Sequence, residues 1–222
     1  MIDLHLGRYA LGVSIAAILV GCFGSQPGVG TPGAVTQNAA HRVAPQTSYG
    51  NCPQYSGGTG ILSDGDFSQA ANPGNHNITY YKGAVFAPAW KVSKGNIDFN
   101  GTTYWDLDGL CSVDLDGFNT VGGIVTNAFS TKKNATYTVS FVMSGNPDGP
   151  PTVKKMKVQV GSQFTIFTWD TSNGHDVRHG VFATETWKFT ASRLTAVKFA
   201  SQDPPGSGCG AVIGGVSVTK AP

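Results

Sequence analysis

The sequence predicts an all-β fold, and within that class an antiparallel β-sandwich, because three features recur after residue 60. Large apolar side chains fall on alternate positions in several short segments, turn-forming residues separate those segments, and no long helical period of apolar residues is present. Alternation sends successive side chains to opposite faces of a strand, so that one face is buried and the other is wet. Many short strands of this kind favour a sandwich or jelly roll.

Four segments show the alternation. They are residues 137–144, 155–160, 186–190 and, more weakly, 195–199. In the second segment three apolar residues alternate with Lys155, Lys157 and Gln159, which we expect to face solvent. Clusters of Gly, Pro, Asn, Asp and Ser separate the segments and predict turns. These clusters are residues 145–149, 172–174 and 203–206.

A different pattern precedes the domain. Residues Leu11 to Gly21 form an uncharged apolar run that follows Arg8. The run is shorter than the roughly 20 residues that span a bilayer, so it indicates the hydrophobic part of a secretory signal peptide. Its end, Leu19-Val20-Gly21-Cys22, resembles the bacterial lipobox, which implies cleavage before Cys22 and lipidation of its thiol. A plain secretory leader with a chance cysteine is the alternative.

The position after that cysteine bears on location. Residue 23 is Phe rather than Asp, so the signal that retains lipoproteins in the inner membrane of a Gram-negative cell is missing. We therefore expect a protein of the bacterial cell envelope, lipid-anchored and extracytoplasmic, and held at the outer membrane if the cell is Gram-negative.

Composition divides the rest of the chain in two. Residues 22–60 are rich in Gly, Pro, Ser, Gln, Thr and Ala and lack apolar periodicity, which is typical of a flexible tether. We therefore expect a leader at 1–21, a tether at 22–60 and one β-sandwich domain at 61–220. The alternative is that 22–60 is a poorly patterned part of the domain, chiefly because Cys52 lies in it. A net charge of +2 with 13% charged residues argues against a nucleic-acid partner.

The domain resembles a known family. Ser63 to Phe67 resembles the N-G-D-F-E opening of many sandwich carbohydrate-binding modules. The motifs that follow resemble, in order, the bacterial choice-of-anchor C family, which is related to the plant cell-wall proteins of domain-of-unknown-function family 642. These motifs are residues 90–92, 96–99, 103–105, 112–117, 136–141, 145–149 and 151–154. The resemblance covers Ile61 to Val218 and implies a galactose-binding-like jelly roll, an interchangeable anchor and polysaccharide binding.

Two departures from related modules bear on metal binding. Those modules often hold a structural calcium ion between an acid after the opening Phe and an acid in the closing strand. Here Ser68 and Gly214 stand at these positions, so the resemblance implies that this calcium ion is absent and we expect no cofactor. The doublets 106–109 and 114–117 (D-L-D-G) lack the spacing and closing Glu of a calcium loop. Two interpretations of these doublets remain: their aspartates stabilise turns, or they bind a cation at another site.

The cysteines fit an exported protein. If Cys22 is lipidated, Cys52, Cys111 and Cys209 remain and allow one disulfide. Cys111 and Cys209 each open a predicted strand. We therefore expect a Cys111–Cys209 disulfide, with Cys52 free or bonded to another molecule.

No catalytic set is apparent. After removal of the leader the chain contains a single Glu, Glu185, whereas glycoside hydrolysis usually uses two carboxyl groups. The histidines do not fall in a nucleophile or zinc motif. These histidines are His41, His76, His175 and His179. His175 and His179 flank a polar loop, for which a metal role and a solvated loop are the two interpretations. We expect a non-enzymatic protein.

Aromatic residues carry the binding hypothesis, because sugar rings stack their C–H faces on flat aromatic surfaces. Four aromatic residues lie in loop-like segments and two polar residues lie in the 145–149 turn. We take as candidate ligand contacts Tyr80, Tyr81, Tyr104, Trp105, Asn146 and Asp148. Trp105 and Tyr104 have a structural alternative as caps of the sandwich, and Trp90 and Trp187 are expected in the core. The predicted function is non-catalytic polysaccharide binding; the alternative is a structural or adhesion module that contacts other surface proteins.

Overall fold

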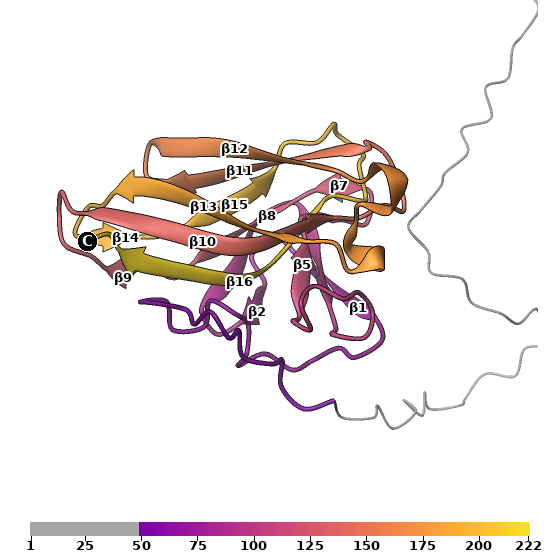
Figure 1. Cartoon of the computed structure of the whole chain (residues 1–222), viewed down its shortest axis with the longest axis horizontal. Coiled ribbons are helices and arrows are strands. Elements are labelled where there is room, and N and C mark those ends of the chain that lie inside the picture. The colour runs from indigo at the N-terminus through magenta and orange to yellow at the C-terminus, as the bar shows by residue number, and fades with distance from the viewer. Residues whose placement is uncertain (1–48) are drawn as a thin grey trace, which may run out of the picture.

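The computed structural model describes residues 49–222, and these form two six-stranded sheets packed face to face (Figure 1). The leader at 1–21, Cys22, His41 and most of the expected tether lie outside the described residues. All pairings between named strands are antiparallel. The predicted all-β, antiparallel sandwich is therefore confirmed.

The first sheet has the strand order β1-β4-β5-β16-β10-β13. Its strands are β1 (Asn77–Tyr81), β4 (Asn96–Asn100), β5 (Ser112–Asp114), β10 (Thr136–Gly145), β13 (Ala183–Thr190) and β16 (Ala211–Lys220).

The second sheet has the strand order β12-β11-β15-β8-β3-β2. Its strands are β2 (Val85–Ala87), β3 (Trp90–Lys94), β8 (Gly123–Thr126), β11 (Val153–Val160), β12 (Gln163–Asp170) and β15 (Lys198–Ser201).

Short elements complete the fold. Two small ribbons pair β6 (Asp116–Gly117) with β7 (Thr120–Val121) and β9 (Phe129–Ser130) with β14 (Leu194–Thr195). Two single-turn helices, η1 (Ser172–Gly174) and η2 (Val177–His179), lie in the loop between β12 and β13. Within residues 49–222, no helix has the length and apolar character that crossing a membrane requires.

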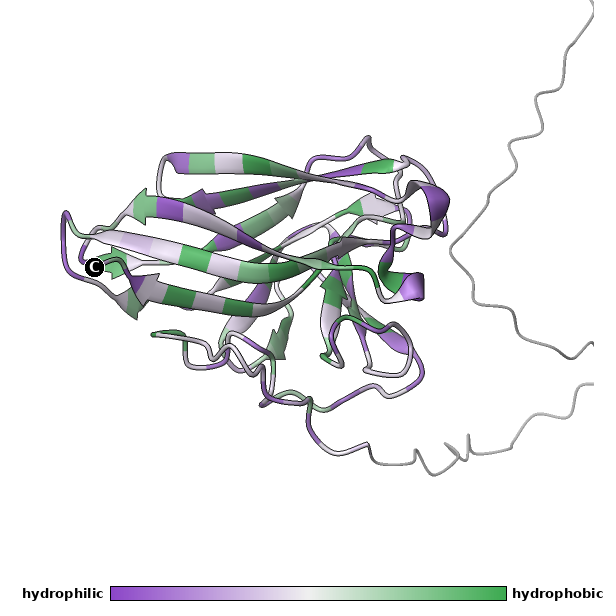
Figure 2. Ribbon diagram, in the orientation of Figure 1, coloured by the Kyte–Doolittle hydropathy of each residue, from purple (hydrophilic) through white to green (hydrophobic). Residues whose placement is uncertain are grey.

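The alternating pattern translates directly into strand faces, as the banded colouring along the strands in Figure 2 illustrates. In β11, Met156 and Val158 are buried, whereas Lys155 is exposed and Lys157 is partly exposed. The segments predicted at 137–144, 155–160 and 186–190 lie within β10, β11 and β13. A shift of one residue in the pairing of such a strand would turn its apolar side chains toward solvent, so burial of one face determines the register.

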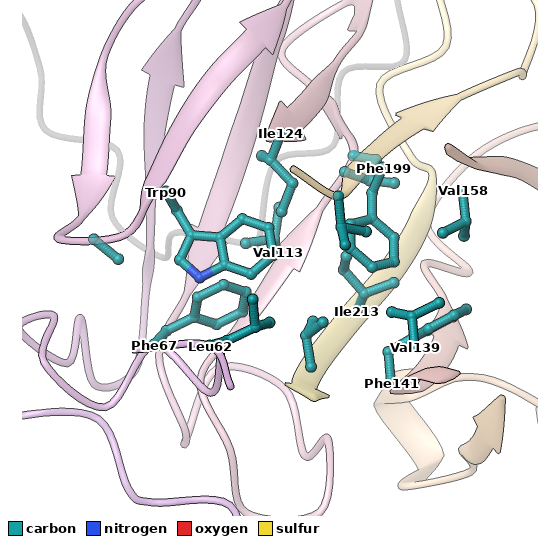
Figure 3. Close-up of a cluster of buried hydrophobic side chains, with 14 of the residues drawn as sticks. Leu62, Phe67, Trp90, Val113, Ile124, Val139, Phe141, Val158, Phe199 and Ile213 are labelled. Atoms are coloured by element: carbon teal, nitrogen blue, oxygen red, sulfur yellow. The ribbon is translucent and has the colours of Figure 1, made fainter. Parts of the chain in front are cut away.

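The core lies between the inner faces of the two sheets (Figure 3). Phe67 is fully buried at its centre, with its ring 5.3 Å from that of Trp90 and 5.9 Å from that of Phe99. Edge-to-face pairs of this kind add about 0.5–1.5 kcal/mol each to the burial of the rings. The indole N–H of Trp90 donates to the carbonyl of Asp64 at 2.6 Å. The core role predicted for Trp90 is confirmed, and Trp187 packs partly buried against the same core.

The described chain joins the sandwich before residue 61. Cys52 is buried and forms a disulfide with Cys111, Asn51 bridges to Ala71, and Gly60 bridges to Val218 of β16. Residues that composition assigned to the tether are therefore held on the domain by a covalent bond and by backbone pairing.

The predicted Cys111–Cys209 disulfide is wrong, and so is the prediction that Cys52 is free or intermolecular. Cys111 and Cys209 do precede neighbouring strands, β5 and β16, but these strands are antiparallel, with Val212 opposite Asp114. Continuing that register places Cys209 near residue 117, about 20 Å along the strand from Cys111. A disulfide needs Cα atoms within about 7 Å, and Cys52 meets this requirement at 5.7 Å from Cys111.

Candidate ligand-binding face

Polar side chains line the outer face of the first sheet near its β1 edge. Ile97 and Phe99 of β4 point into the core, so Asp98 between them points outward. Asp98 lies opposite Thr79 of β1 and Asp114 of β5. The Thr79 hydroxyl donates to Asp98 Oδ1 at 2.6 Å, which confirms that the two side chains share this outer face.

A second hydrophobic cluster covers the outer face farther from that edge. Its buried members are Trp105, Leu107, Leu110, Val142, Val177 and Val212. Val142 of β10 and Val212 of β16 point away from the main core, and the 101–111 loop and η2 bury them. Trp105 is only 7% exposed, so the expectation that its ring is available for stacking is wrong. The structural alternative, a cap on the sandwich, holds for this residue.

Tyr104 remains half-buried at the border of this cluster, with its ring centre 5.0 Å from that of Trp105. Burial raises the pKa of the Tyr104 hydroxyl, and the charges of Asp148, Asp98 and Asp114 raise it further, whereas Arg178 lowers it. The fold thus brings Tyr104 into the same electrostatic environment as Asp148, which was predicted from a separate part of the sequence.

The 145–149 turn approaches the same region. The Asn146 side chain donates to Asp114 Oδ2 at 2.8 Å and accepts from the backbone N–H of Asp148 at 2.9 Å. Because Asn146 is buried and both ends of its amide are used, it positions the turn rather than contacting a ligand. Asp148 forms an ion pair with Arg178 of η2 and so links the turn to the helical loop.

The two adjacent tyrosines of β1 point to opposite faces, as strand geometry requires. Tyr80 faces inward and packs partly buried against the core, with its ring 6.0 Å from Phe86 and 6.5 Å from Phe99, so we leave it out of the candidate binding face. Tyr81 is 63% exposed and shares the outward parity of Thr79. Of the two, only Tyr81 presents a ring to solvent.

Together these residues form what we term the polar face: Asn77, Thr79, Tyr81, Asp98 and Tyr104. The loop that carries Tyr104 is anchored at the Asn77 end, since the backbone N–H of Gly101 donates to the carbonyl of His76 at 3.1 Å. Tyr81 stands at the other end of β1. Four residues of strand separate Asn77 from Tyr81, which corresponds to about 13 Å.

Asp98 lies in the middle of the polar face. Burial raises the pKa of its carboxyl group, and hydrogen bonds from Thr79 and Asn77 partly offset this rise. Sequence reasoning missed Asn77, Thr79 and Asp98. The signal was present in the alternation of 77–81 and 96–100, but the pairing that sets Thr79 beside Asp98 involves residues distant in sequence.

A buried ionic cluster supports the turn beside this face. The Lys154 ammonium group is buried and donates to the carbonyls of Gly149 and Cys209, each at 2.7 Å. Three buried aspartates lie around it, namely Asp114, Asp116 and Asp203. Asp114 Oδ1 accepts from the backbone N–H groups of Gly210 and Asp116, each at 2.9 Å.

Burial dominates the protonation equilibria of this cluster. It raises the pKa of Asp114 well above its usual range and raises that of Asp203 to about 7, with the charge of Asp116 adding to both. Burial also lowers the pKa of Lys154, although the surrounding carboxylates oppose that shift. The cluster therefore holds fewer net negative charges at neutral pH than its composition suggests.

Within residues 49–222, no group of three or more His, Cys, Asp or Glu side chains is arranged to hold a metal ion. Asp106 Oδ1 accepts from the backbone N–H of Gly109 at 2.9 Å, which is the turn chemistry expected for that doublet. The second doublet is buried in the ionic cluster. At Gly214 a side chain would meet Leu107 at 3.0 Å, so packing occupies that position. The absence of calcium stays a prediction.

The two loop histidines are held separately. His175 stacks on Trp169 with ring centres 4.6 Å apart, and His179 Nδ1 lies 2.9 Å from Asp176 Oδ1. They flank short 3-10 turns rather than one helix, so their spacing in sequence does not bring them together on a helix face.

No curated protein matches the sequence. Similar solved structures include one titled "CBM4 structure and function" (15% identity, TM-score 0.39, 72% of this chain and 99% of that chain). Another is a CBM35 from Paenibacillus barcinonensis (15% identity, TM-score 0.41, 65% of this chain and 99% of that chain). A third, an exo-beta-1,3-galactanase from Phanerochaete chrysosporium, is 14% identical with a TM-score of 0.40, over 64% of this chain and 29% of that chain.

The family comparison is more specific. The model of the family described as "Protein of unknown function (DUF642)" matches residues 60–219. This range contains all residues of the polar face and both sheets except Lys220, the last residue of β16. The chain therefore belongs to the DUF642 family.

Proposed function

We propose that this protein is a lipid-anchored, extracytoplasmic module that binds polysaccharide of the cell surface or wall through the polar face, without catalysis. The observation that carries the proposal is a row of outward side chains at the β1 edge of the first sheet, with an exposed ring at one end. Asn77, Thr79 and Tyr81 span about 13 Å of β1, Asp98 lies beside Thr79, and Tyr104 shares the electrostatic environment of Asp98.

The chemistry of this row matches that of a sugar chain. A pyranose ring offers an apolar C–H face to an aromatic ring, while its hydroxyl groups need donors and acceptors at fixed positions. Tyr81 is exposed and Tyr104 is half-buried, so both can present part of a ring. The Thr79–Asp98 hydrogen bond fixes two polar side chains of the row, which limits the entropy lost when a ligand binds.

Assignment as a binder rather than a hydrolase rests on the carboxyl groups near Tyr104. Hydrolysis usually requires one carboxylic acid and one carboxylate flanking the scissile bond. Asp148 is engaged by Arg178, and Asp98 accepts from Thr79 and lies beside Asn77. Turnover by the purified protein on a panel of wall and matrix polysaccharides would overturn this assignment.

A binding measurement with matched variants tests the polar face. We expect Tyr81→Ala and Tyr104→Ala each to weaken polysaccharide binding about five- to tenfold, because one stacked ring is lost. Lys133→Ala removes an exposed side chain from the turn before β10 and serves as the control. Glycan-array screening would identify the ligand, and calorimetry would give the affinities. Unchanged binding in Tyr81→Ala and Asp98→Asn would contradict the proposed site.

The anchor forms a separate part of the proposal. It is supported by the lipobox-like sequence that ends at Cys22 and by the resemblance to the choice-of-anchor C family, whose members carry interchangeable anchors. Cells fed a labelled fatty acid should incorporate the label into the wild-type protein but not into Cys22→Ala. Equal labelling of both proteins, or recovery of wild type without label from the culture medium, would contradict the anchor.

A structural or adhesion role is the second candidate. It is favoured by the edge strands β12 and β13, whose outer backbone groups have no neighbouring strand within their sheets, since such edges can pair with another chain. Chemical crosslinking on intact cells that captures a protein partner, together with no retention on any glycan, would favour this role over polysaccharide binding.

A further inference from the structure

The outer face of the second sheet carries lysines in register across its strands. Lys198 of β15 lies opposite Gln159 on one side and opposite Val125 on the other, and Val125 lies opposite Lys91 of β3. Neighbouring strands are about 4.8 Å apart, so Lys91 and Lys198 stand about 10 Å apart on one straight row. Both lysines point away from the core, because Val92 and Phe199 beside them are buried in it.

A second row runs beside the first. Lys157 of β11 lies opposite Ala200, which lies opposite Gly123, which in turn lies opposite Lys94. Lys155 shares the outward parity of Lys157 on the same strand. Five lysines from three strands therefore project from one sheet face.

A single acidic side chain accompanies the five lysines on this face. It is Asp170, the last residue of β12, and it is the one acid in the six strands of the second sheet. Across residues 49–222 the ion pairs are Arg178–Asp148 and His179–Asp176, so these lysines form none with described residues. Uncompensated cations on one face produce a local positive potential even though the whole chain carries a formal net charge of only +2.

A hollow lies at the β3 end of the first row. It has a volume of about 430 Å³ and is lined by Lys82, Gly83, Lys91, Val92, Ser93 and Val125. Its size falls in the range of ligand sites, about 300–1,000 Å³. Lys82 and Lys91 bring two cationic side chains to the lining and Val125 brings an apolar one, a combination that suits a sugar unit with a negative charge.

An aromatic ring stands at the opposite end of the same row. Phe164 of β12 lies opposite Gln159 and is 60% exposed. The Lys157 ammonium group lies 5.7 Å from the centre of its ring, within the range of a cation–π contact. From Phe164 to Lys91 the row crosses four strand spacings, which corresponds to about 19 Å.

We propose that this face, which we term the lysine face, is a second binding site and that it takes an acidic polysaccharide. Uronate or sulfate groups pair with Lys91, Lys198 and Lys157, one charged sugar enters the hollow, and another stacks on Phe164. An extended polymer fits because the cations are spread along a nearly straight row on a sheet. A flat anionic membrane fits less well, because it cannot enter the hollow. The site is independent of the polar face, which lies on the other sheet.

Charge-matched double variants of the mature chain test the proposal. The probe is polygalacturonate, with dextran as the neutral polymer, measured by calorimetry at low and at physiological salt. Lys91→Gln/Lys198→Gln removes two charges from the lysine face, and we expect it to weaken polygalacturonate binding about tenfold or more and to reduce the dependence on salt. Lys132→Gln/Lys133→Gln removes two exposed charges from the turn before β10 and is expected to change the affinity less than twofold. Phe164→Ala should weaken binding several-fold.

Four outcomes would overturn the lysine face as an acidic-polysaccharide site. They are no binding of polygalacturonate by the wild-type chain, equal binding of dextran, equal loss in the two double variants, and stronger binding to vesicles that contain anionic phospholipid than to polygalacturonate. Circular dichroism and thermal melting would establish that each variant is folded. Tyr81→Ala and Asp98→Asn should retain polygalacturonate binding, so failure of the polar face and failure of the lysine face are distinguishable.

Discussion

The outer faces of the two sheets differ although the sheets share strand number and pairing. On the first sheet the 101–111 loop and η2 cover much of the outer face, and carboxyl and amide groups line the part left open. On the second sheet the outer face carries lysines opposite short apolar or polar residues. The inner faces must match because they build one core, but the outer faces are free to diverge.

The sequence of each strand explains which face needs a cover. Val142 and Val212 point outward from the centre of the first sheet, and exposing them to water would forgo the free energy gained by their burial. The outward side chains of β11 in the second sheet are polar and are solvated by water without a cover. They are Lys155, Lys157 and Gln159. Covering loops are therefore expected on the first sheet and not on the second.

Lys154 joins the two sheets, and its substitution should have the largest effect. In Lys154→Met the carbonyls of Gly149 and Cys209 lose their buried donor, and three buried aspartates lose their neighbouring cation. We expect the free energy of unfolding to fall by about 3–5 kcal/mol. Urea denaturation would measure the loss. Lys155→Met, one residue away on the exposed face, is the control and should change stability by no more than about 0.5 kcal/mol; equal losses would contradict the role of Lys154.

The Cys52–Cys111 disulfide should affect the two faces unequally. It closes a loop between residues separated by 59 positions, and the double variant Cys52→Ala/Cys111→Ala should lose about 2–4 kcal/mol of stability. The loop that carries Tyr104 ends at Cys111, so hydrogen exchange should accelerate in residues 49–60 and 101–111. Exchange in β11 and β12 should rise much less. Uniform acceleration throughout both sheets would show that the bond stabilises the domain globally rather than this side of it.

Elements with a strong local pattern could be predicted from the sequence. β10, β11 and β13 are long strands whose alternation determines their two faces without reference to other strands. The disulfide could not be predicted in this way, because it depends on strand direction. Two cysteines that each precede a strand lie at opposite ends when those strands are antiparallel.

The candidate faces were predictable only in part for the same reason. Exposure of Tyr81 was anticipated, but Trp105 is buried and Asn146 is used within the turn. Whether a loop aromatic is exposed depends on what covers the sheet beneath it. Outward orientation of Lys155 and Lys157 follows from alternation. Their proximity to Lys91 and Lys198 follows only from the strand order β11-β15-β8-β3.

A pH titration would separate the buried carboxyl groups from the exposed lysines. The folded-state pKa of Asp203 is about 7 and that of Asp64 about 6, both raised mainly by burial, so the folded state binds more protons than the unfolded state above about pH 4. This contribution to stability is fully present below the unfolded pKa and is lost as the pH rises through the folded pKa. We therefore expect the free energy of unfolding to fall as the pH rises from 4 to 7.5.

The matched variant for this effect is Asp203→Asn, which removes one of the titrating groups while keeping its size. Its stability should depend less steeply on pH between 4 and 7.5 than that of the wild-type protein, measured by thermal melting across that range. Asp170→Asn is the control. Hydrogen bonds to Ser172 lower the pKa of the exposed Asp170, so removing this group cannot make the free energy of unfolding fall less steeply as the pH rises. A stability that rises with pH over this range would contradict the assignment.

The smallest effect on stability is expected beside the polar face, where Arg178 of η2 pairs with Asp148. The Arg178 side chain is 58% exposed, so Arg178→Ala should lower the free energy of unfolding by no more than about 0.5 kcal/mol.

The charge of Arg178 nevertheless lowers the pKa of the Tyr104 hydroxyl, whereas the charge of Asp148 raises it. Arg178→Ala should therefore raise the Tyr104 pKa and Asp148→Ala should lower it, as followed by NMR of labelled tyrosine with Tyr104→Phe to assign the signal. Arg193→Ala, an exposed charge in the loop before β14, is the control. Opposite shifts in the first two variants and none in the third would show that the ion pair and Tyr104 are electrostatically coupled. A stability loss above about 1 kcal/mol in Arg178→Ala would instead make the ion pair a structural element of the loop.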